Sequence, residues 1–169
     1  MKLKFILAAS ILAAASFSAM AVTGPIVFGP FGNAAFDNRP DTASFSDVFT
    51  FSVPYALSEA TASVTSSINH GKDVDISSII LSSSGGPSFA FTKNSGDPNE
   101  HWSLASVILS AGVNYLLTLT GTQAGAGGLG NYAGQISVSA VPEPETYALM
   151  LAGLGVIGFI ARRRRPQQR

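Results

Sequence analysis

An alternation of polar and apolar residues dominates the middle of the chain and constrains its fold more than any other feature. Ser and Thr make up 28 of the 120 residues from 22 to 141, and many of them alternate with apolar side chains. In the stretch VNYLLTLT at 113–120, Tyr115, Leu117 and Leu119 fall on one face of an extended chain. A period of two predicts β-strands with one buried face and one face in water.

Clusters of Gly, Pro, Asn and Asp divide this region into short segments, and no long helical period lies between them. Parallel strands would need such helices as connections, so antiparallel pairing is expected. We therefore predict an all-β fold, an antiparallel β-sandwich with jelly-roll-like connections and about eight strands, as one domain over residues 22–141. The predicted strands are 26–28, 44–53, 60–68, 76–82, 88–93, 104–109, 113–120 and 135–141.

The N-terminus has the three parts of an export signal. Two lysines precede an apolar run from residue 5 to 17, and Ala19 and Ala21 then form a small-x-small site for signal peptidase. An apolar run of 13 residues is short for a membrane span, which favours a cleaved signal over an anchor. We predict a signal helix and signal peptide over residues 1–21, and export of the rest of the chain.

The predicted domain is acidic although the whole chain is formally neutral. Between residues 22 and 141, eight acidic residues outnumber three basic ones, which gives a net charge of −5. Such a surface repels phosphate backbones, so nucleic acid is not an expected partner. The chain also has no cysteine, which excludes thiolate nucleophiles and cysteine-bound zinc or haem.

A second apolar segment lies near the C-terminus, where residues 147–161 carry no charge. As a helix this segment is about 22 Å long, against a hydrocarbon core of about 30 Å, and arginines that reach the headgroups extend it. We predict a transmembrane helix in the inner membrane, with the arginines on the cytoplasmic side and residues 166–169 as a cytoplasmic tail. The basic stop-transfer residues are Arg162, Arg163, Arg164 and Arg165.

Pro142, Glu143 and Pro144 stand directly before the apolar segment. Pro-Glu-Pro, an apolar segment and an arginine cluster, in this order over residues 142–165, resemble the PEP-CTERM sorting domain of exported bacterial proteins. The resemblance implies processing by an exosortase, a membrane-embedded transpeptidase-like protease that removes the anchor and releases or attaches the protein at the surface. It also implies an association with species that make exopolysaccharide and biofilm matrix.

Phe45, Asp47 and Phe49 fit the Phe-x-Asp-x-Phe signature of one group of PEP-CTERM proteins, and residues 109–115 are also similar to that group. The group has no established biochemical activity, so this resemblance names a family and no mechanism. Alternation places Asp47 on the same face as both phenylalanines. A bare carboxylate in a core would cost on the order of several kcal/mol, so Asp47 is expected to have partners.

Two kinds of partner for Asp47 are considered. We expect it to cap a neighbouring turn or to pair with Arg39, the only arginine of the predicted domain. The alternative is a shared cation such as calcium, but no spacing in the chain matches an ordered calcium loop, so no metal and no cofactor are predicted. The acids that would share such a cation are Asp37, Asp41, Asp73 and Asp75.

Candidate catalytic and binding residues are few. His70 and His101 lie in polar loops and are expected to be solvated, so no enzyme is predicted, with a hydrolase that uses His101 as base as the minor alternative. Trp102 is expected to be the first inward residue of its strand. The alternative is a glycan contact, in which Trp102, Tyr132 or Tyr55 stacks on a sugar ring.

Together these features predict an exported, non-enzymatic protein that reaches the cell surface or the extracellular matrix and has a structural role there. Its expected partners are signal peptidase, an exosortase, the inner membrane during transit, and extracellular polysaccharide. A carbohydrate-binding module for matrix polysaccharide is the alternative function.

Overall fold

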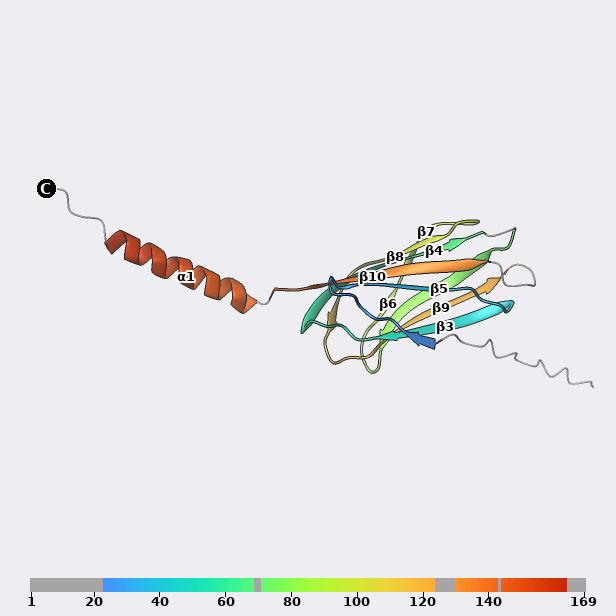
Figure 1. The fold of residues 1–169 in the computed structure, drawn as a ribbon, viewed down its shortest axis with the longest axis horizontal. Helices are drawn as coiled ribbons and strands as arrows, with labels where there is room; N and C mark the ends of the chain where they lie inside the picture. The colour runs from blue at the N-terminus through green and yellow to red at the C-terminus, as the bar shows by residue number, and fades with distance from the viewer. Residues whose placement is uncertain (1–22, 69–70, 124–129, 143, 164–169) are drawn as a thin grey trace, which may run out of the picture.

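The computed structural model describes residues 23–68, 71–123, 130–142 and 144–163, which form ten strands and one helix (Figure 1). The signal peptide predicted over residues 1–21 lies outside the described residues. The elements are β1 (Thr23–Pro25), β2 (Asn33–Asn38), β3 (Ser44–Phe51), β4 (Leu57–Ser67), β5 (Val74–Ser83), β6 (Ser88–Ala90), β7 (Thr92–Ser95), β8 (His101–Ser110), β9 (Tyr115–Gln123), β10 (Asn131–Ala140) and α1 (Pro144–Arg163).

The strands form two five-stranded sheets. The first has the order β1-β3-β9-β5-β6, and the second has the order β2-β10-β4-β8-β7. All paired strands run antiparallel except β1, which is parallel to β3. The all-β prediction is confirmed, with ten strands in the described residues where about eight were expected. The jelly-roll description of the connections stays a prediction.

The alternation in the sequence corresponds to alternating burial in the strands. Phe45, Phe49 and Phe51 on β3 are all buried, and most of the residues between them are only partly covered. Two pairs of rings join the sheets: Phe45 stacks on Tyr132 with 5.8 Å between ring centroids, and Phe36 packs on Phe49 at 5.1 Å. The two sheets therefore share one hydrophobic core.

Two glycines in the strands make room for these rings. Gly121 on β9 lies opposite Phe45, and Gly134 on β10 lies opposite Phe36. A Cβ atom on Gly121 would lie 2.7 Å from the Phe45 ring, and one on Gly134 would lie 2.3 Å from the Phe36 ring. A glycine at each position thus lets an aromatic ring cover the neighbouring strand.

Three segments differ from the strands predicted from sequence. Residues 26–28 follow β1 as a connection, and β2 is a strand that the sequence reasoning misses because it alternates over only six residues. The predicted strand 88–93 divides at Phe91 into β6 and β7, which lie in different sheets. Phe91 is buried, and its amide donates to the Ile79 carbonyl at 3.0 Å, so the chain crosses between the sheets at this residue.

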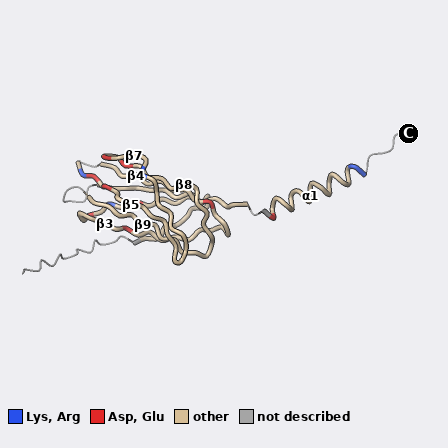
Figure 2. The backbone as a smooth tube through the Cα atoms, turned by 180° about the vertical axis from the view of Figure 1, so that it is seen from behind, with Lys and Arg blue, Asp and Glu red and all other residues tan. Residues whose placement is uncertain are grey.

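The connections between strands meet at two ends of the domain, and charged residues gather at the end away from α1 (Figure 2). We name the end next to α1 the tail end and the opposite one the far end. The tail-end connections are residues 26–32, 52–56, 84–87 and 111–114. The described far-end connections include residues 39–43, 68, 71–73 and 96–100.

Candidate functional site

The C-terminal segment leaves the domain directly from its last strand. The Val141 amide donates to the Leu57 carbonyl at 3.0 Å, so the pairing of β10 with β4 continues one residue beyond β10. Pro142 is exposed, and α1 begins at Pro144, while Glu143 lies outside the described residues. The Pro-Glu-Pro segment therefore forms the short link between the sheet and the helix, and its last residue, Pro144, is also the first residue of α1.

The helix α1 is long enough to cross a bilayer. Its 20 residues correspond to about 30 Å, which matches a hydrocarbon core of about 30 Å. The uncharged residues 147–161 alone predict a shorter span, and the helix is longer because it also includes residues 144–146, 162 and 163. Glu145 lies in the first turn, and Arg162 and Arg163 lie in the last turn, where each complements the helix dipole. Arg164 and Arg165 lie outside the described residues.

The side chains of α1 from 145 to 163 are exposed, and none of the span Glu145–Arg163 is buried against the domain. Water is a poor surrounding for such a surface, so the helix is suited to a membrane. Its large apolar side chains, each between 47% and 74% exposed, are Tyr147, Leu149, Met150, Leu151, Leu154, Val156, Ile157, Phe159 and Ile160.

Asp47 lies between the sheets and is 1% exposed, so the inward orientation expected from alternation is correct. Its carboxylate accepts a hydrogen bond from the Tyr132 hydroxyl at 2.5 Å and another from the Asn38 side-chain amide at 2.8 Å. These two donors belong to β10 and β2, in the opposite sheet. Burial, together with the hydrogen bond to Asp47, raises the pKa of Tyr132. Pairing of Asp47 with Arg39 stays a prediction.

A second carboxylate, that of Glu100, is also buried between the sheets. Glu100 accepts a hydrogen bond from the Ile76 amide at 2.7 Å and a weaker one from Trp102 Nε1 at 3.5 Å. It also forms an ion pair with the Lys93 ammonium group, and this hydrogen bond raises the pKa of Lys93. Ile76 belongs to β5, so Glu100 joins the start of β8 to the first sheet.

Trp102 is 7% exposed and lies in the core as the first inward residue of its strand, which confirms the expected arrangement. The Lys93 ammonium group lies 5.6 Å from the centre of its ring. Tyr132 is 0% exposed. Because both rings are buried, neither presents a face to a sugar in this structure. The carbohydrate-binding hypothesis stays a prediction, and of its three candidate residues Tyr55 is the one that is partly exposed.

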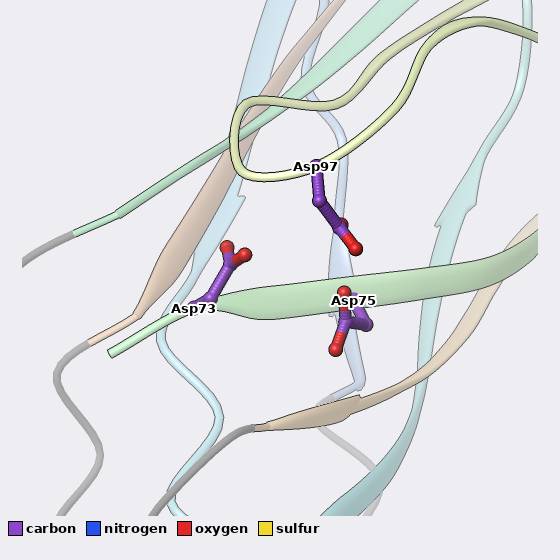
Figure 3. Close-up of side chains that lie close together, drawn as sticks. All are labelled: Asp73, Asp75 and Asp97. Carbon is purple, nitrogen blue, oxygen red and sulfur yellow. The ribbon is translucent and has the colours of Figure 1, made fainter. Parts of the chain in front are cut away.

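Three other carboxylates gather at the far end of the domain, as Figure 3 shows. Asp73 directly precedes β5, Asp75 is the second residue of β5, and Asp97 comes from the connection between β7 and β8. One oxygen atom from each lies within 4.8 Å of the other two. Carboxylate oxygens are ligands for hard cations such as calcium. The sequence grouped Asp73 and Asp75 with Asp47, whereas the structure groups them with Asp97.

Hydrogen bonding, burial and neighbouring charges raise the pKa values of Asp75 and Asp73. A hydrogen bond with Asp97, followed by burial and the charge of Asp97, raises the pKa of Asp75 above its ordinary value of 3.8. Burial raises the pKa of Asp73, although the Val74 amide, which donates to it at 2.8 Å, acts in the opposite direction. Ionisation of the cluster therefore opposes folding.

Replacing Asp75 with asparagine is expected to raise the free energy of unfolding at pH 7, by less than about 1 kcal/mol because solvent screens these partly exposed groups. Because the pKa of Asp75 is raised in the folded state, its carboxyl group stabilises the fold at pH values below 3.8. This contribution to stability is lost as the pH rises through the raised pKa. The gain should thus be present at pH 7 and absent near pH 3.5. Urea denaturation at both pH values measures it, with Asp41→Asn as the exposed control. A loss of stability at pH 7 would contradict the repulsion.

His101 begins β8 and is partly exposed. Its Nδ1 lies 3.1 Å from the side-chain nitrogen of Asn94, which also donates to the Ser103 hydroxyl at 2.7 Å. This arrangement places the ring in a surface network of amide and hydroxyl groups. His70 lies outside the described residues.

Comparison with known protein families settles the nature of the C-terminal segment. The family described as PEP-CTERM protein-sorting motif matches residues 140–165, from the end of β10 through α1. The segment is a PEP-CTERM sorting motif. It implies processing by an exosortase and, together with the apolar helix, indicates an exported precursor that is anchored in a membrane. No curated protein matches the chain.

The PEP-CTERM match includes the predicted motif residues Pro142, Glu143 and Pro144 and the four arginines from 162 to 165. Their individual roles in sorting stay predictions. Membership of the Phe-x-Asp-x-Phe group also stays a prediction, although Phe45, Asp47 and Phe49 all face the core. In the domain, the motif residue Asp47 is thus a point of attachment between the sheets.

Several solved structures are similar to the chain over 70% of its length. A periplasmic inhibitor of g-type lysozyme from Aeromonas hydrophila is 16% identical, with 97% of that protein covered and a TM-score of 0.42. A mutant of the corresponding inhibitor from Escherichia coli is 14% identical, with 99% covered and a TM-score of 0.41. The pre-peptidase C-terminal domain of a Bacillus anthracis collagenase is 14% identical, with 96% covered and a TM-score of 0.35.

Proposed function

We propose that the protein has a structural, non-enzymatic role at the cell surface or in the extracellular matrix, and that an exosortase delivers it there by removing α1. The PEP-CTERM motif directly after the last strand carries this proposal. Cutting within the link would separate a complete two-sheet domain from an exposed apolar helix. The domain would then keep every strand that contributes to its core.

The chemistry of the link supports its recognition by a protease. Pro142 and Pro144 have no amide hydrogen, so neither can donate a hydrogen bond to a sheet. A residue before proline is disfavoured in the helical conformation, which favours an extended conformation at Val141. An extended conformation is one of the forms in which peptides enter recognition grooves.

The use of the buried polar groups supports a structural role. Asp47 and Glu100, the two acidic side chains buried in the described part of the domain, accept hydrogen bonds that join one sheet to the other. Outward-facing positions on the long strands are instead rich in Ser and Thr, as on β4 and β10. This surface is hydrophilic and offers many hydroxyl groups to a polysaccharide matrix.

The two ends of the chain support the proposed route. The predicted signal peptide directs the domain across the inner membrane, and signal peptidase would act at Ala19 and Ala21. The arginines after α1 would then stay on the cytoplasmic side as a stop-transfer signal. In this orientation the Pro-Glu-Pro link faces the outer side of the membrane, next to the domain.

Replacing Pro142, Glu143 and Pro144 together with alanine is expected to keep the uncut precursor in the membrane fraction, because alanine removes both prolines and the carboxylate. Immunoblots of membrane and released fractions measure the ratio of precursor to mature chain. Pro54→Ala, which changes an exposed proline in the connection from β3 to β4, is the control and should be processed normally. Normal processing of the triple variant would refute recognition of this segment.

A further inference from the structure

The two ends of the domain differ in charge. The four tail-end connections contain no Asp, Glu, Lys or Arg. The far-end connections carry four acidic and two basic residues, including Asp73, Asp97 and Glu100. The tube in Figure 2 shows this separation along the long axis of the domain. Among the charged residues on the strands, Glu59 on β4 lies nearest to the tail end. Its carboxylate accepts a hydrogen bond from the Ser106 hydroxyl.

The tail end also exposes large apolar side chains. Phe31 is 86% exposed and Val27 is 78% exposed, and both belong to the connection from β1 to β2. Leu57 at the start of β4 is 39% exposed, and its carbonyl holds Val141 at the beginning of the link to α1. These apolar side chains therefore belong to the same end of the domain as the chain that leads into the helix.

The length of the link places this surface near the membrane. Four residue steps separate Ala140 at the end of β10 from Pro144 at the start of α1, and they span at most about 14 Å. The headgroup layer on one side of a bilayer is about 5–8 Å thick. When α1 spans the membrane, the end of β10 thus lies within about 14 Å of the hydrocarbon core, so the tail end is close to the headgroup layer.

We propose that the tail end of the domain contacts the outer leaflet of the membrane in the anchored precursor, with Val27 and Phe31 inserted among the lipid headgroups. The four connections between strands at this end carry no charge, so their transfer to the interface has little desolvation penalty, and exposed apolar side chains favour the interface. The acidic far end is repelled by anionic lipid and points away. The contact holds the Pro-Glu-Pro link at the membrane surface, and this inference rests on the anchored precursor described above.

Single-cysteine labelling tests the contact, because the natural chain has no cysteine. The full-length variants Phe31→Cys, Ile68→Cys and Leu151→Cys would each carry an environment-sensitive fluorophore, in nanodiscs with one chain per disc. Ile68 is 46% exposed at the far end and is the matched control, while Leu151 lies on α1 and reports insertion. Circular dichroism confirms that each variant keeps its strands. Lipids that carry a nitroxide near the headgroup quench a label that touches them.

The label at 31 is expected to be quenched several-fold more strongly than the label at 68, and to emit at shorter wavelength. Quenching at 151 together with equal, weak quenching at 31 and 68 would overturn the contact while leaving the anchor intact. An emission shift at 31 without nitroxide quenching would overturn it as well, because protein would then cover the site. Absence of quenching at 151 would remove the anchor on which the inference rests, and the contact with it.

Discussion

Replacing Asp47 with alanine is expected to lower the free energy of unfolding by about 2–4 kcal/mol, a large part of the 5–15 kcal/mol typical of a domain. The substitution leaves the hydroxyl of Tyr132, a fully buried residue, without its acceptor, and it also removes the acceptor of the Asn38 amide. An unsatisfied buried donor costs about 1–3 kcal/mol. Urea denaturation followed by Trp102 fluorescence measures the change. Asp37→Ala removes an exposed carboxylate and should change stability by less than about 0.5 kcal/mol.

A double-mutant cycle separates the lost hydrogen bonds from the lost volume. Tyr132→Phe alone should destabilise the domain, because it removes one donor from the Asp47 carboxylate. In the Asp47→Ala background, Tyr132→Phe removes a hydroxyl that has already lost its acceptor. It should therefore lower the free energy of unfolding little, or raise it. Purely additive effects would show that Asp47 and Tyr132 contribute independently, contrary to the geometry.

Replacing Lys93 with methionine is expected to destabilise the domain by about 2–4 kcal/mol, although this lysine is partly exposed. The loss arises at its partner, since the Glu100 side chain is 0% exposed and would be left without the cation that pairs with it. Breaking a fully buried pair costs roughly 3–5 kcal/mol, and the partial exposure of Lys93 lowers the figure. Denaturation followed by circular dichroism avoids any direct effect on Trp102. Lys72→Met, at the same end of the domain, is the control and should change stability little.

A second substitution tests whether the buried charge causes this loss. Adding Glu100→Gln to Lys93→Met removes the charge and keeps an oxygen that accepts from the Ile76 amide. The double variant should therefore be more stable than Lys93→Met alone. A double variant that is less stable by the sum of the two single changes would contradict the role of the ion pair.

The sequence predicts most of the strands because burial alternates with the same period as polarity. On β3, the alternation also predicts that Asp47 faces inward together with Phe45 and Phe49. It does not predict the partner Tyr132, which lies 85 residues away, because a period within one strand says nothing about the opposite sheet. The split at Phe91 is hidden for a similar reason, since a chain that crosses between two sheets keeps its apolar residues facing one shared core.

The far-end groups show the same limit. Asp73 and Asp75 are two residues apart, so their proximity can be predicted from the sequence. Asp97 joins them only through the packing of β7 and β8 against the first sheet. Glu100 stands four residues before Leu104, in a segment that reads as a polar loop. Its neighbours in the sequence therefore do not predict that it is buried against Ile76. The sorting motif needs no such packing, because its prolines, apolar segment and arginines lie in one continuous stretch.

The intact mass of the protein recovered from the cell surface tests the central claim most directly. Processing by an exosortase predicts a chain that ends at or near Pro142–Pro144 and lacks α1 together with the arginines from 162 to 165. Cells without the processing enzyme should retain the uncut chain. A surface protein from wild-type cells whose mass still includes α1 and these arginines would contradict the account and would make the helix a permanent anchor.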